Sequence, residues 1–84
     1  MNSKHRKTLA EIFATPVNGA IEWARIEALL VALGCQVVEG KGSAVTFFKG
    51  NEKLHTHRPH PGRESLRYRV SEAREFLKDI GVTP

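Results

Sequence analysis

Apolar side chains recur every three or four residues in three stretches of the chain, a spacing that places them on one side of an α-helix. The first stretch covers residues 3–14, where Ser3 is the predicted N-cap and Pro16 lies just beyond the expected end. The last stretch covers residues 66–80 and stops at Gly81. Both patterns predict amphipathic helices.

The middle stretch is the most regular of the three. Trp23, Ile26, Leu30 and Leu33 follow one another at intervals of three, four and three, and Gly34 closes the pattern. Such a stripe is typical of a helix that packs on a core. We therefore assign these side chains no role in ligand binding.

Between the last two helices the apolar period shortens to two, which is typical of strands. Residues 37–38 lead into the segment 39–43 (Glu-Gly-Lys-Gly-Ser), where two glycines permit a tight turn. Residues 44–48 then alternate as the second strand of a hairpin. A second turn at residues 49–51 (Lys-Gly-Asn) precedes a third strand over residues 54–58.

The expected order of elements is therefore helix, helix, three antiparallel strands and helix. This order predicts an α+β fold in which the helices cover one face of a three-stranded antiparallel sheet. We expect a single domain over residues 1–84, with the other face of the sheet left to meet a partner.

Positive charge is concentrated in the second half of the chain. The 84 residues include 13 Lys and Arg and 9 Asp and Glu, a net charge of +4. Residues 41–69 alone hold seven Lys and Arg against two Glu, together with three of the four histidines. This basic block favours a polyanionic partner such as RNA, because phosphate neutralisation dominates nucleic-acid affinity. A merely solvated basic face is the alternative.

Composition also excludes several classes of site. Cys35 is the only cysteine, so neither an intramolecular disulfide nor an all-cysteine zinc site can form, and we expect Cys35 to be a small buried hydrophobe. No apolar run is long enough for a signal peptide or a membrane span, which predicts a cytoplasmic protein without a membrane partner. A chain this small is not expected to enclose a cofactor.

The candidate chemistry lies at residues 55–61, which read His-Thr-His-Arg-Pro-His-Pro. Strand alternation predicts His55 and His57 on one face, and His60 follows where Pro59 and Pro61 end the strand. Metal-free RNA cleavage needs a base for the ribose 2′-hydroxyl, an acid for the leaving oxygen and a cation near the phosphorus. The histidines and the neighbouring arginine offer these parts.

The histidines have two other interpretations. The spacing His-x-His-x-x-His can chelate zinc, which makes a small metal-binding protein an alternative, but few carboxylates lie nearby and the local charge is positive. We therefore predict no metal ligands and no cofactor. Surface histidines without a catalytic role are the second alternative, and His5 in particular is expected to be solvated.

Four short motifs occur in an order and spacing that resemble the HicA toxins of toxin-antitoxin pairs. They are Trp23-x-x-Ile26-x-x-Leu-Leu30-x-x-Leu33-Gly34, Gly40-Lys-Gly-Ser43, Pro59-His60-Pro61 and Ile80-Gly81-Val82. The resemblance spans residues 21–82 and implies a fold like a double-stranded-RNA-binding domain (dsRBD), with residues 1–16 as an extra N-terminal helix. It also implies a ribosome-independent mRNA interferase that inhibits translation and growth and is neutralised by a HicB-like antitoxin.

One departure from that family affects the predicted site. HicA proteins commonly place the catalytic histidine directly after the Gly-Ser pair, where this chain has Ala44. Two alternatives stay open: His57 or His60 supplies the acid-base function, or the chain is inactive as given and serves as a non-catalytic RNA- or antitoxin-binding module. His60 is carried over from the family motif, whereas His57 follows from strand geometry. The predicted RNA-binding residues are Lys41, Gly42, Ser43, Arg58 and Arg63.

Overall fold

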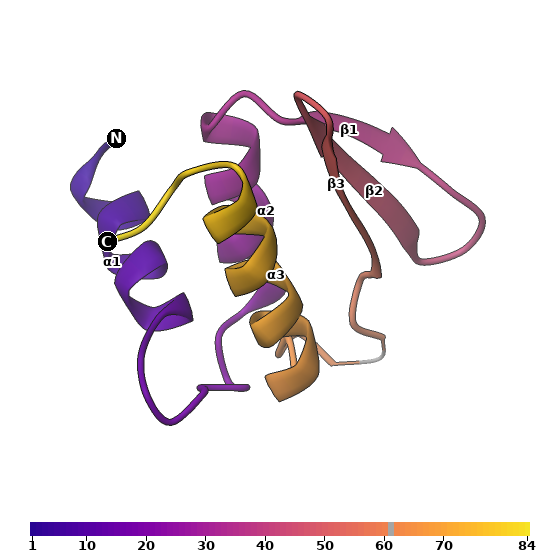
Figure 1. Ribbon diagram of the computed structural model, residues 1–84. Coiled ribbons are helices and arrows are strands. Elements are labelled where there is room, and N and C mark those ends of the chain that lie inside the picture. The colour runs from indigo at the N-terminus through magenta and orange to yellow at the C-terminus, as the bar shows by residue number, and fades with distance from the viewer. Residues whose placement is uncertain (61) are drawn as a thin grey trace.

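The computed structural model describes residues 1–60 and 62–84, so Pro61 of the expected Pro-His-Pro motif lies outside the described residues. Within these described residues, three helices and three strands follow one another in the expected order (Figure 1). They are α1 (Ser3–Ile12), α2 (Trp23–Ala32), β1 (Gln36–Glu39), β2 (Ala44–Lys49), β3 (Glu52–His57) and α3 (Arg67–Asp79). The predicted α+β fold of the dsRBD-like kind is confirmed.

The three strands form one antiparallel sheet in the order β1-β2-β3. Gly42 and Gly50 sit in the two hairpin turns with φ angles of 58° and 59°, a left-handed conformation that glycine adopts without steric cost. Both predicted turns are therefore confirmed. The third strand begins at Glu52, two residues earlier than expected, because Lys49 pairs with Glu52 across the turn.

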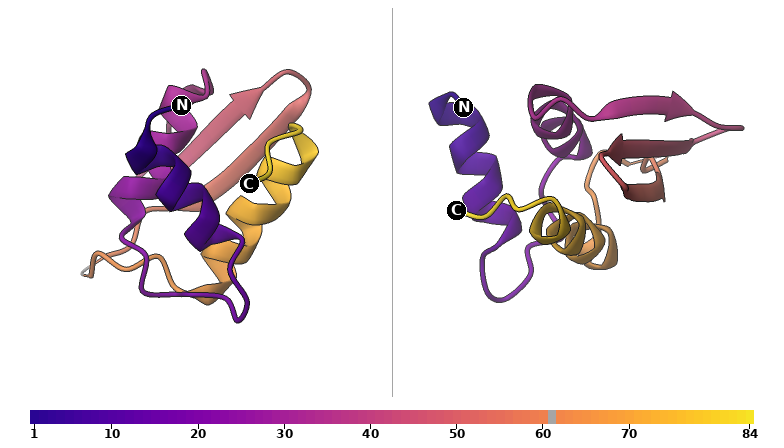
Figure 2. Two further views of the ribbon diagram at one scale, coloured as in Figure 1. Left: turned by 90° about the vertical axis from the view of Figure 1, so that its left-hand side faces the viewer. Right: turned by 45° about the horizontal axis from the view of Figure 1, so that its top comes forward.

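The elements form three layers. Figures 1 and 2 show α2 and α3 between the sheet and α1, so only the last two helices cover the sheet. The helix α1, the expected N-terminal extension, packs on α2 and α3. Buried apolar side chains from the three helices and from β2 and β3 form the core, including Ile12, Ile26, Phe47, Leu54 and Leu77.

The ends of the helices depend on individual residues. Asn2 rather than Ser3 caps α1, because its backbone is extended and its Oδ1 accepts a hydrogen bond from the His5 N–H at 2.8 Å. Ser3 already lies inside the helix, so the predicted N-cap was wrong by one residue. The predicted stop of α2 is confirmed, since Gly34 follows the helix with a φ of 88°.

Two arginines hold α1 in place. Arg74 of α3 donates to the carbonyl oxygens of Ile12 (2.9 Å) and Ala14 (2.7 Å), which lie at the C-terminal end of α1 where carbonyls lack helical partners. Arg25 of α2 forms an ion pair with Glu11.

Among the described residues, no helix is both long enough and apolar enough to cross a membrane.

Candidate functional site

The face of the sheet that turns away from the helices carries the candidate chemistry. Leu54 and Thr56 of β3 are buried, while His55 and His57 are exposed, so the predicted alternation along this strand is confirmed. In the register of the sheet, Thr46 of β2 is the partner of His55. The exposed side chains of His55 and His57 lie on the outer face of the sheet, and Figure 2 shows that no described helix covers this face.

His55 and His57 contact each other. Their ring centroids are 5.6 Å apart and the rings meet edge to face, at an interplanar angle of 79°. The Thr46 hydroxyl lies 2.8 Å from His55 Nδ1, a hydrogen bond that fixes the orientation of this ring and leaves Nε2 free. The arrangement is a pair of imidazoles with one member held in place.

Ala44 lies directly across the sheet from His57. The two residues are paired in the antiparallel register, and directly opposite residues have Cβ atoms about 4.5–5.5 Å apart. Position 44 is fixed by the hairpin, because the Ala44 N–H donates to the Lys41 carbonyl at 3.0 Å and its carbonyl accepts from the Gly40 N–H at 2.9 Å. The His57 imidazole is thus the neighbour of the position at which the family resemblance places a histidine.

The predicted RNA-binding turn borders this pair. Lys41 and Gly42 are exposed at its tip, and the Ser43 carbonyl accepts a hydrogen bond from the Arg58 N–H at 2.9 Å. The hydrogen bonds within residues 40–44 are those of a hairpin turn. Lys41 is the one charged side chain that this turn offers to a ligand.

Arg58 has a different environment from the one expected of a phosphate ligand. Its guanidinium donates to both carboxylate oxygens of Glu27 (2.9 Å each) and to both of Glu39 (2.6 and 2.9 Å). Glu27 also accepts from Trp23 Nε1 at 2.9 Å. Arg58 therefore ties the end of β3 to α2 and β1, and its side chain is occupied by carboxylates.

These contacts shift the ionisation of all three charged groups. The hydrogen bond from Arg58 holds the pKa of Glu27 below its ordinary value, although burial acts in the opposite direction. Separate hydrogen bonds from Arg58 lower the pKa of Glu39, and the bonds to the two carboxylates raise the pKa of Arg58. The cluster is therefore fully charged at neutral pH.

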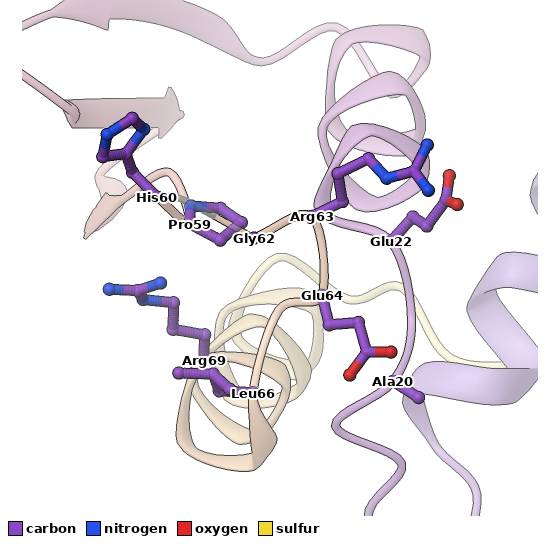
Figure 3. Close-up of a pocket in the computed structure, with 9 residues that line it drawn as sticks. All are labelled: Ala20, Glu22, Pro59, His60, Gly62, Arg63, Glu64, Leu66 and Arg69. Atoms are coloured by element: carbon purple, nitrogen blue, oxygen red, sulfur yellow. The ribbon is translucent and has the colours of Figure 1, made fainter.

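His60 and Arg63 lie elsewhere, in a cleft of about 600 Å³ between the segment after β3 and the start of α3. Figure 3 shows the side chains of His60 and Arg69 at one end of this cleft, with Arg63 and Glu22 toward the other. His57 is not part of the lining. Of the two candidate catalytic histidines, only His60 thus lines this cleft.

Metal binding gains no support from the geometry. Within residues 1–60 and 62–84, no three His, Cys, Asp or Glu side chains are grouped so that they can hold a metal ion. Cys35 is buried as predicted, and burial raises the pKa of its thiol. His5 is half-buried beside Ala24 and Ala28 of α2, so the expectation of a solvated side chain was wrong.

Two residues were missed by the sequence analysis, one on the open sheet face and one in the cleft. Thr46 meets His55 only through the register of β2 and β3, which no periodicity gives. Arg69 lines the cleft because α3 begins beside the cleft. In the sequence, only its place in the basic block at residues 41–69 pointed to a binding role.

The comparisons with known proteins point to one family. The family model described as "HicA toxin of bacterial toxin-antitoxin" matches residues 23–82, which is the chain from the first residue of α2 to just beyond α3. The helix α1 lies outside the match. No curated protein gives a significant match, and neither does any solved structure.

Proposed function

Because the chain belongs to the HicA toxin family of bacterial toxin-antitoxin systems, we propose that it is a metal-independent endoribonuclease that cleaves mRNA and thereby inhibits translation and growth. The observation that carries this proposal is the cross-strand pairing of His57 with Ala44 on the open face of the sheet. It puts an imidazole beside the position that the family resemblance assigns to the catalytic histidine.

The proposed chemistry is an internal transfer at phosphorus. A histidine removes the proton of a ribose 2′-hydroxyl, and the 2′-oxygen attacks the adjacent phosphorus atom. The bond from phosphorus to the 5′-oxygen breaks, and an imidazolium donates a proton to the leaving oxygen. The products are a 2′,3′-cyclic phosphate and a 5′-hydroxyl, and no metal ion is required.

His57 and His55 are the proposed base and acid. Their rings are in contact on one exposed surface, so both can reach a single phosphodiester, and the Thr46 hydrogen bond orients one of them. His60 was the partner that the sequence suggested for His57. The ring contact supports His55 in that role instead, because His60 lines a separate cleft.

Neighbouring groups on the same face suit unpaired RNA. Lys41 and Lys53 are exposed and provide positive charge for the backbone. Phe48 is 37% exposed and Val38 44% exposed on the outer face, and an exposed aromatic ring stacks with an unpaired base whatever its identity. The substrate we propose is therefore single-stranded or locally unpaired mRNA, with Gly42 and Ser43 shaping the turn that carries Lys41.

A second candidate function is motivated by Ala44. A methyl group transfers no proton, so a chain that depends on a histidine at position 44 would bind RNA or a HicB-like antitoxin without catalysis. This candidate predicts binding that weakens steeply with salt and leaves the RNA intact.

Incubation of the purified protein with a long mRNA, with and without a chelator, separates the candidates. Cleavage that persists in the chelator supports the proposal, and cleavage that the chelator abolishes contradicts its metal-free chemistry. RNA that is bound but intact favours the non-catalytic module. The His57→Gln variant is the control for a contaminating nuclease.

A further inference from the structure

The cleft beside α3 has the features of a binding site that is distinct from the histidine pair. It measures about 600 Å³ and is lined by residues from three segments: the linker before α2, the segment after β3 and the first turn of α3. Its lining includes three side chains that can carry positive charge, namely His60, Arg63 and Arg69. Which ligand the cleft can bind depends on whether carboxylates already neutralise these charges.

Among the residues that the structure describes, the ion pairs of arginine involve only Arg25 and Arg58. Neither Arg63 nor Arg69 has a carboxylate at ion-pair distance within that part of the chain. The Arg69 guanidinium lies 5.1 Å from the centroid of the Tyr68 ring, which restricts its motion without neutralising it. Arg69 is therefore a positioned cation without a carboxylate partner among the described residues.

The charges in the cleft are segregated. Figure 3 shows the His60 ring and the Arg69 guanidinium on one side, while the carboxylates of Glu22 and Glu64 point away from that side. A guanidinium presents paired N–H donors that match two oxygens of a phosphate, and an imidazole adds a further donor. By its charge and its donors, the end of the cleft that His60 and Arg69 line therefore suits a phosphate group (Figure 3).

Hydrogen bonds hold together the two segments that border the cleft. The Trp23 N–H donates to the Arg63 carbonyl at 2.9 Å, and the Ser65 N–H donates to the Ile21 carbonyl at 2.9 Å. The fully buried Ser65 hydroxyl donates to the same Ile21 carbonyl at 2.8 Å. These bonds fix residues 63–65 against the start of α2 and the linker before it, so this part of the cleft is formed before any ligand arrives.

We propose that His60 and Arg69 bind a phosphate group of the RNA at a position next to the phosphate that is cleaved. The identity of the ligand as RNA rests on the proposed function. Its position follows from the chain, because the cleft begins at Pro59, two residues after His57. The group is either an internal phosphodiester or a terminal phosphate of the same strand. His60 is thus a binding residue and not one of the proton-transfer pair.

The test uses a short RNA with 2′-O-methyl groups throughout, which cannot be cleaved by attack of a 2′-hydroxyl, so binding is measured whether or not the protein is a nuclease. Arg69→Gln is compared with Arg67→Gln, which removes the same charge from the same turn of α3 but lies outside the cleft lining. We expect Arg69→Gln to weaken binding about tenfold and to lower the salt dependence by about one ion, with Arg67→Gln close to the wild type. Arg69→Lys should restore the salt dependence in part.

Equal effects of the two substitutions, or no binding of this RNA by the wild type at low salt, would overturn the phosphate site. Oligonucleotides with and without a 5′-phosphate then identify the source of the group: a preference for the phosphorylated strand that Arg69→Gln removes indicates a terminal phosphate, and equal binding indicates an internal one. Cleavage of mRNA by the wild type is scored separately. The phosphate site can therefore fail while the nuclease proposal stands, and the reverse also holds.

Discussion

Ala44 on β2 and His57 on β3 are direct cross-strand partners on the open face of the sheet. The family resemblance places a histidine at position 44, and in this chain the adjacent strand presents one at the opposite position. A catalytic imidazole can thus occupy nearly the same region of the surface from either strand. This relationship connects the missing family histidine with the histidine cluster of residues 55–61.

Restoring a histidine at position 44 should increase RNA cleavage. In the Ala44→His variant the new imidazole lies beside His57, and an added acid-base group contributes about 10²- to 10⁴-fold to a rate. The measurement is the initial rate on a defined mRNA in a chelator. Ala44→Gln is the matched control, because it adds a side chain of similar size without a titrating group. An unchanged rate in Ala44→His would show that position 44 is not a vacated catalytic position.

The two candidate partners of His57 can be told apart by kinetics. We expect His55→Gln to lower kcat by about 10²-fold or more with little change in KM, because His55 is proposed to transfer a proton. His60→Gln should raise KM and leave kcat nearly unchanged, because His60 is proposed to bind phosphate. The opposite pattern, with kcat lost in His60→Gln and kept in His55→Gln, would indicate that His60 and not His55 transfers a proton.

The Arg58 cluster should make folding stability depend on pH in the acidic range. Arg58 lowers the pKa of Glu27 in the folded protein, so the pair stabilises the fold in full above the ordinary value of 4.5 and loses this contribution as pH falls through the lowered value. Arg58→Gln should lower the free energy of unfolding by about 1 kcal/mol at pH 7. The effect is small because the side chains are partly exposed to solvent.

The check on this prediction is urea unfolding of the wild type and Arg58→Gln at pH 7 and at pH 3. The difference between the two proteins should shrink at pH 3, where the carboxylates bind protons. Lys78→Gln is the control, since it breaks an exposed pair with Glu75 on α3 and should change stability by less than about 0.5 kcal/mol. A difference between wild type and Arg58→Gln that is independent of pH would contradict the assignment.

Removal of the Arg74 side chain should release α1. Arg74→Ala deletes the donors to the Ile12 and Ala14 carbonyls and should destabilise the protein by about 1–3 kcal/mol. Hydrogen exchange should accelerate first in residues 3–12, because α3 keeps its contacts with β3 and Trp23 of α2 keeps its contact with Phe47 of β2. Arg6→Ala on the exposed side of α1 should leave both quantities unchanged, and uniform acceleration along the chain would argue against a local role.

The fold was largely predictable because its elements follow local periodicity. The stripe from Trp23 to Leu33 and the alternation of His55 and His57 each depend on neighbours only a few residues apart. The Arg58 cluster depends on partners 31 and 19 positions away, and the Thr46 contact depends on strand register, so neither could be predicted from spacing. Because these carboxylates are distant in the sequence, we expected Arg58 to bind phosphate. In the folded protein its guanidinium is hydrogen-bonded to Glu27 and Glu39 instead.

The proposal that His57 cleaves RNA without a metal ion is tested most directly by comparing the wild type with His57→Gln on one mRNA in a chelator and determining the chemistry of the cut ends. We predict that the wild type produces 2′,3′-cyclic phosphate and 5′-hydroxyl ends, and that His57→Gln is slower by about 10²- to 10⁴-fold while still binding the RNA. Equal cleavage rates for the two proteins, or RNA left intact by both, would contradict the proposal.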